Sequence, residues 1–167
     1  PELKQMDGMA EHGKLWAQWQ GKAYADITHC YDDVSVAKQK IYDEMYEDLN
    51  DLISVICPIE NEKDPLWEKG ARSIILATCL AMLEDSEDPS LGMTKEKFNF
   101  YNLNKALANS ENNYQALKDY FKGRSPLSQA VTLSRQVLSA AEATMSSYMS
   151  ITFDKLNMFN DRGLCGL

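Results

Sequence analysis

Apolar side chains recur every three or four residues along most of this chain, which is the spacing of one face of an α-helix. The clearest stripe begins after Asp33 and ends before Pro58, a residue that cannot continue a helix. We therefore predict an amphipathic helix over residues 33–57, with its apolar face turned to a core. The stripe consists of Val34, Ala37, Ile41, Met45, Leu49, Leu52, Ile53 and Ile56.

A second segment is apolar on nearly every side, and its residues Ile74–Leu83 carry no charge. A helix that crosses a bilayer needs about 20 apolar residues, so this run is too short to span a membrane. Asp64 is a favourable capping residue and Pro65 suits the first helical position. We therefore expect a central, buried helix over residues 65–84, with Trp67 as an aromatic anchor near its start.

The third long stripe follows Ser125 and Pro126, which repeat the signal of a capping residue before a proline. We expect one long helix over residues 126–159. Its middle, Ser139–Ser147, is rich in small residues, which allows close approach of another helix or a bend. The stripe consists of Leu127, Ala130, Val131, Val137, Leu138, Ala141, Met145, Tyr148, Met149, Phe153 and Leu156.

Two shorter helical patterns lie between these stripes. Thr94 is a plausible cap for the first, and the second ends at Gly123, which we expect in the left-handed conformation. No sustained alternation of apolar and polar residues predicts a strand. The predicted fold class is therefore all-α, a compact multi-helix bundle with two to three long helices (33–57, 65–84 and 126–159) and several short ones.

At 167 residues, with 44% hydrophobic and 25% charged side chains, the chain suits one folded domain over residues 1–167. Residues 1–32 are a poorly defined helical or loop segment, because Gly13 and Gly21 interrupt the only apolar cluster there. The chain begins at Pro1 with neither Met nor a basic and then apolar leader. We therefore expect no secretion signal, and an excised part of something larger. The scattered cysteines favour a reducing compartment.

Charge is distributed unevenly along the chain. Residues 1–94 carry a net charge of −11 and residues 95–167 a net charge of +3, so the first part would repel nucleic acid. A dense acidic strip lies on the polar side of the predicted helix 33–57. A solvated helix face is the common explanation of such a strip, and a surface for a partner is the alternative. The candidate docking residues are Asp43, Glu44, Glu47, Asp48 and Asp51 in the strip, and Glu84, Asp85, Glu87 and Asp88 in the spacer after the central helix.

We find no pattern of residues that predicts catalysis. The four cysteines form no C-x-x-C pair, and neither His12 nor His29 follows a Glu at the spacing of di-iron sites. A P-loop, a G-x-S-x-G motif and an H-E-x-x-H motif are all missing from the sequence. We therefore predict no catalytic, cofactor-binding or metal-binding residue in this chain, and we disfavour a helical-bundle enzyme.

The stretch DPLWEKGARSIILATCLAML, Asp64–Leu83, resembles a family signature, D-P-[FL]-W-x-x-x-A-[RE]-x-[IL]-[IL]. That signature begins the central helix of the all-alpha domain in TraG/TraD-like coupling proteins, the ATPases of conjugative type IV secretion systems. A looser likeness covers FNFYNLNKAL and KLNMFND farther along, whereas residues 1–60 do not match.

The resemblance implies a cytoplasmic domain, an insertion in a RecA-like motor domain of a hexameric parent at the inner face of the bacterial plasma membrane. ATP and Mg would bind elsewhere in that parent, so no nucleotide-binding residue carries over to this chain. The implied function is non-catalytic recognition of the transferred substrate. The implied partner is a relaxase or a relaxosome accessory protein, with single-stranded DNA contacted indirectly. A stand-alone helical adaptor is the alternative that the residues leave open.

Overall fold

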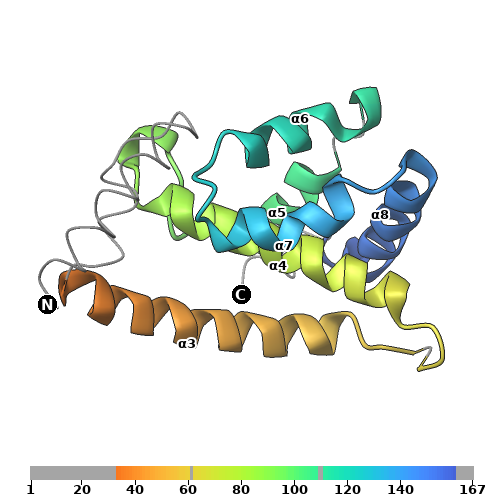
Figure 1. Cartoon of the computed structure of the whole chain (residues 1–167), viewed down its shortest axis with the longest axis horizontal. Coiled ribbons are helices and arrows are strands. Elements are labelled where there is room, and N and C mark those ends of the chain that lie inside the picture. Colours follow the sequence, from red (N-terminus) through yellow and green to blue (C-terminus); the bar gives the residue numbers. More distant parts are fainter. Residues whose placement is uncertain (1–32, 61, 109–110, 161–167) are drawn as a thin grey trace, which may run out of the picture. The chain divides into compact units, whose positions relative to one another are not determined.

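The computed structural model describes residues 33–60, 62–108 and 111–160, and all regular structure within them is helical (Figure 1). The predicted all-α fold class is confirmed. The prediction for residues 1–32 lies outside the described residues. The described α-helices are α3 (Asp33–Ile56), α4 (Leu66–Ser86), α5 (Phe100–Leu107), α6 (Glu111–Lys122), α7 (Gln129–Leu138) and α8 (Glu142–Leu156), and the described 3-10 helices are η2 (Pro89–Leu91) and η3 (Asn157–Asn160).

The chain divides into two units by its internal packing. The first unit comprises residues 1–47 with 125–127. Within this unit the structure describes residues 33–47, which form the first part of α3, and the short segment 125–127. The second unit comprises residues 48–124 with 128–167, and it holds the end of α3 and every other described helix. A single domain over residues 1–167 stays a prediction.

Helix α4 is the centre of the second unit. Helices α7 and α8 pack along it, and α5 and η2 contact it over shorter stretches (Figure 1). Every residue from Ile74 to Met82 is buried, including Thr78, whose hydroxyl donates a hydrogen bond to the Ile74 carbonyl at 2.7 Å. Burial on all sides accounts for the nearly continuous apolar sequence, and it confirms the predicted central helix. None of the described helices has the length and apolar character that a membrane crossing requires.

Glycine allows α8 to approach the start of α4 closely. A Cβ atom at Gly70 would overlap the ring of Tyr148, which is buried on α8. The ring of Trp67, one turn earlier on α4, lies 5.4 Å from the Tyr148 ring, centroid to centroid. Trp67 itself is half-buried. It therefore anchors α4 against α8 at the edge of the core.

The predicted helix over residues 126–159 is wrong as a single element. It is broken into α7 and α8 at residues 139–141, where Ala141 takes an extended conformation with ψ of 149°. The Ser139 hydroxyl donates a hydrogen bond to the Arg135 carbonyl at 2.6 Å, so this serine helps to end α7. The break lies inside the stretch of small residues, where a bend was one of the two predicted outcomes.

Several predicted helix ends are displaced. Helix α4 begins after Pro65 rather than after Asp64, and Pro65 accepts the first helical hydrogen bond, from the Lys69 N–H at 3.0 Å. The caps are Ser128 for α7, in place of Ser125, and Asn99 for α5, in place of Thr94. Gly123 does follow α6, but among the described glycines only Gly92 has a positive φ, so the predicted left-handed conformation of Gly123 is wrong.

The apolar stripe of α3 faces the core only in part. Ile53 is 1% exposed, whereas Ile41 is 56% and Leu52 is 44% exposed. A cation from the next helix satisfies the end of α3: the Arg72 guanidinium donates to the Cys57 carbonyl at 2.6 Å and to the Ser54 carbonyl at 3.4 Å. This contact compensates for the absence of a basic residue in the last turn of α3.

Candidate docking surface

The acidic strip on α3 is open to solvent. All five predicted residues, Asp43, Glu44, Glu47, Asp48 and Asp51, are exposed. Lys40 Nζ lies 3.9 Å from Glu44 Oε1, and these two side chains are 79% and 66% exposed. An ion pair that long and that exposed contributes little to stability. The strip therefore presents its negative charge outward, and this part of the predicted docking surface is accessible.

A small apolar hollow lies beside the second part of this strip. It has a volume of about 100 Å³ and is lined by Leu49 and Leu52 of α3 together with residues of α4, α5 and the turn before α5. Asp48 and Asp51 precede these two leucines directly in α3. Because Leu52 follows Asp48 by one helical turn, both side chains lie on the same face of the helix. A partner with an apolar residue next to basic residues would match this arrangement.

The acids of the spacer after α4 have a different environment. Asp88 is the N-cap of η2, and its Oδ1 accepts a hydrogen bond from the Ser90 N–H at 2.9 Å. Hydrogen bonds from Ser90 lower the pKa of this carboxyl. Gly92 then ends η2 with a φ of 66°, a conformation that favours glycine. Asp88 therefore has a local structural role as a cap.

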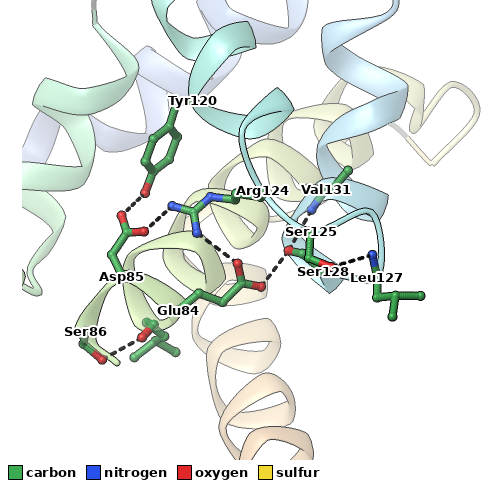
Figure 2. A network of polar contacts seen from close by, with 10 residues as sticks. Glu84, Asp85, Ser86, Tyr120, Arg124, Ser125, Leu127, Ser128 and Val131 are labelled. Atoms are coloured by element: carbon green, nitrogen blue, oxygen red, sulfur yellow. Dashed lines mark hydrogen bonds and ion pairs between the residues drawn. The ribbon is translucent and has the colours of Figure 1, made fainter. Parts of the chain in front are cut away.

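Glu84 and Asp85, at the end of α4, form ion pairs with one arginine (Figure 2). Arg124, which follows α6, lies 2.9 Å from Glu84 Oε2 through Nη1 and 2.6 Å from Asp85 Oδ1 through Nη2. The Arg124 side chain is only 11% exposed, and those of Glu84 and Asp85 are 29% and 14% exposed. Both ion pairs are therefore largely shielded from water, unlike the contact on α3.

Two hydroxyl groups complete this network. The Tyr120 hydroxyl donates to Asp85 Oδ2 at 2.5 Å, and the Ser128 hydroxyl donates to Glu84 Oε1 at 2.6 Å (Figure 2). Each of the four carboxylate oxygens thus has a partner. The contacts join the end of α4 to the end of α6 and to the N-cap of α7. Acids at a helix C-terminus are unfavourable for the helix dipole, and Arg124 offsets this cost.

The network also changes the acidity of its members. Burial and the hydrogen bond to Asp85 raise the pKa of Tyr120 well above its ordinary range. Burial alone lowers the pKa of Arg124, but Tyr120, Asp85 and Glu84 outweigh it, so the pKa is raised overall. The Arg124 guanidinium also stacks on the Tyr120 ring at 4.3 Å. Arg124 therefore stays charged and Tyr120 stays protonated at neutral pH.

Sequence reasoning missed the partners in this network. Arg124 lies 40 residues from Glu84 along the chain, and no spacing rule links the two. The structure therefore gives the predicted docking residues different surroundings: Glu84, Asp85 and Asp88 have partners within the chain, whereas the five acids of the strip on α3 are exposed. Docking through any of them stays a prediction.

The described residues do not suggest a reaction centre. Within residues 33–60, 62–108 and 111–160, no group of three or more His, Cys, Asp or Glu side chains could hold a metal ion. Cys57 and Cys79 are buried free thiols, and burial raises the pKa of Cys79 to about 12. A thiol with that pKa is a poor nucleophile at neutral pH. The predictions about catalysis and cofactors themselves stay untested.

Comparison with known proteins gave no relatives for this chain. No family model matched it, and neither a curated protein nor a solved structure was found to be similar. The resemblance of Asp64–Leu83 to coupling proteins therefore stands on the residues of that stretch alone.

Proposed function

We propose that this chain is a non-catalytic recognition domain that docks a basic protein partner on the acidic strip of α3. One observation carries the proposal: Asp43, Glu44, Glu47, Asp48 and Asp51 are all exposed on one helix, and no basic residue occurs between positions 41 and 51. A surface with this density of one charge attracts an oppositely charged partner and accelerates its association. The apolar hollow next to Asp48 and Asp51 offers a place for an apolar anchor residue.

We further propose that the domain belongs to a coupling ATPase of a conjugative type IV secretion system. The resemblance over Asp64–Leu83 supports this assignment. The partner would then be a relaxase or a relaxosome accessory protein, and single-stranded DNA would be contacted through that partner. The ATPase itself would be hexameric and would bind ATP and Mg outside this chain, on the cytoplasmic side of the membrane.

A stand-alone helical adaptor is the second candidate, because the same acidic strip would serve either protein. Sequence outside this chain distinguishes the two. A P-loop before Pro1 and an acidic strand motif after Leu167 in the same reading frame would support the coupling protein. An open reading frame without them would exclude it and leave the adaptor.

The docking proposal is tested by measuring the affinity of the protein for a relaxase from the same genome. We expect the triple variant Glu44→Gln, Glu47→Gln, Asp48→Asn to lose about tenfold or more in affinity, because three charges leave the interface. We also expect added salt to weaken binding of the wild type. A matched control, Glu62→Gln, Glu142→Gln, Asp154→Asn, removes three exposed acids elsewhere. Unchanged affinity in the strip variant, or an equal loss in the control, would remove the strip as the docking site.

A further inference from the structure

A second surface, which is basic where the strip on α3 is acidic, lies between α6 and α7. These two helices pack against each other in the second unit and enclose an open groove of about 280 Å³. Phe121 of α6 and Val131 and Leu138 of α7 supply its apolar lining. Phe121 is 3% exposed, and the other two side chains are half-buried. The accessible floor of the groove is therefore aliphatic.

Three cations frame this floor. Lys118 and Lys122 lie one turn apart on α6, and Arg135 lies on α7. Among the described residues, none of the three forms an ion pair, and Lys122 and Arg135 are exposed. The chain as a whole carries a net charge of −8, whereas this groove combines three cations with an apolar floor. It fits a ligand that is both negatively charged and apolar.

The shape and chemistry of the groove favour a polypeptide over a nucleic acid. Sites for single-stranded nucleic acid combine cations that contact phosphates with exposed aromatic rings on which bases stack, and the aromatic ring of Phe121 is covered. A groove between two helices with aliphatic residues at its base is a recurrent site for the apolar face of a third helix. We propose that this groove binds an acidic amphipathic helix of a partner protein. Its apolar side chains would contact Val131 and Leu138, and its acids would face Lys118, Lys122 and Arg135.

This proposal is independent of the acidic strip, and it can be tested with a designed peptide. The probe is a helix of about 18 residues with Leu on one face and Glu on the other, a length at which an isolated helix becomes stable. We expect the variant Lys118→Gln, Lys122→Gln, Arg135→Gln to bind the probe about tenfold or more weakly than the wild type. Lys63→Gln, Lys69→Gln, Lys95→Gln is the control, because it removes three exposed cations outside the groove.

The apolar part of the groove is tested separately by Leu138→Ala, which should weaken binding of the same probe by about fivefold through lost apolar contact. Thermal melts of all variants show whether they remain folded. An equal loss in the control triple variant would contradict the proposal, since net charge alone would then explain binding.

Two other results would also overturn it. If a single-stranded oligonucleotide binds and loses affinity in the groove variant while the peptide does not bind, the groove is a nucleic-acid site. If the wild type sediments as a dimer and the groove variant as a monomer, a second copy of the chain occupies the groove.

Discussion

Two groups of acidic residues in this chain look alike in sequence and differ in structure. The strip on α3 and the pair Glu84 and Asp85 are both dense, and both occur on long helices. In the strip, Glu44 forms a long, exposed ion pair with Lys40, whereas Glu84 and Asp85 form two short ion pairs with the nearly buried Arg124. Glu84 and Asp85 therefore form an internal clamp between helices, whereas the strip is exposed and is our proposed docking surface.

The difference shows that the local density of charge does not reveal what the charge does. The role of a carboxylate depends on what other elements bring near it. Arg124, Tyr120 and Ser128 reach Glu84 and Asp85 because α6 and α7 pack near the end of α4. The acids of the strip, in contrast, are exposed to solvent, and the ion pair between Glu44 and Lys40 is long.

The largest effect on the free energy of unfolding is expected from Arg124→Met. This change leaves Glu84 and Asp85 together in a poorly solvated place, so we expect the free energy of unfolding to fall by about 2–4 kcal/mol. Urea denaturation measures this loss. Arg135→Met is the control, because Arg135 is an exposed arginine, and we expect it to change stability by about 0.5 kcal/mol or less. Equal free energies of unfolding for the two variants would show that the ion pairs of Arg124 with Glu84 and Asp85 do not stabilise the fold.

Tyr120→Phe should lower the free energy of unfolding by a smaller amount, and this loss should depend on pH. Loss of the hydrogen bond to Asp85 should cost about 1–2 kcal/mol at neutral pH. The pKa of Tyr120 is raised above its ordinary 10.0 in the folded state, so its contribution is complete below pH 10.0 and is lost as the pH rises through the folded pKa. The stability advantage of the wild type should therefore stay constant up to about pH 10 and shrink between about pH 10 and about pH 11. A constant advantage over that range would contradict the assigned hydrogen bond.

The smallest effect on stability is expected from the strip itself. Glu44→Gln, Glu47→Gln, Asp48→Asn should change the free energy of unfolding by about 0.5 kcal/mol or less, and relief of repulsion among the acids favours a slight gain. The measurement is again urea denaturation, in the same buffer as for the Arg124 variant. A loss of several kcal/mol would mean that the strip supports the fold and that the contrast between the two groups is wrong.

The helices that sequence predicted best are those whose signals are local. Apolar spacing and Pro58 located α3, and the apolar run after Pro65 located α4. The break at residues 139–141 was not predicted as a helix end, because the apolar spacing continues across it and alanine and serine do not by themselves forbid a helix.

The candidate site was predictable only where it depends on one element. The strip on α3 could be predicted from the sequence, because exposure on a single amphipathic helix follows from its periodicity. The clamp could not be predicted from the sequence, because the partners of Glu84 and Asp85 come from the end of α6 and the start of α7. The groove could not be predicted either, because it exists only where α6 and α7 meet.

The most direct test of the central claim is chemical labelling of carboxylates with and without a relaxase, the partner that we propose. In the free protein, we predict rapid labelling of Glu44, Glu47 and Asp48 and slow labelling of Asp85, which is 14% exposed. On binding, labelling of the strip should fall while that of Glu84 and Asp85 stays the same. Protection of Glu84 and Asp85 with an unchanged strip would contradict the account.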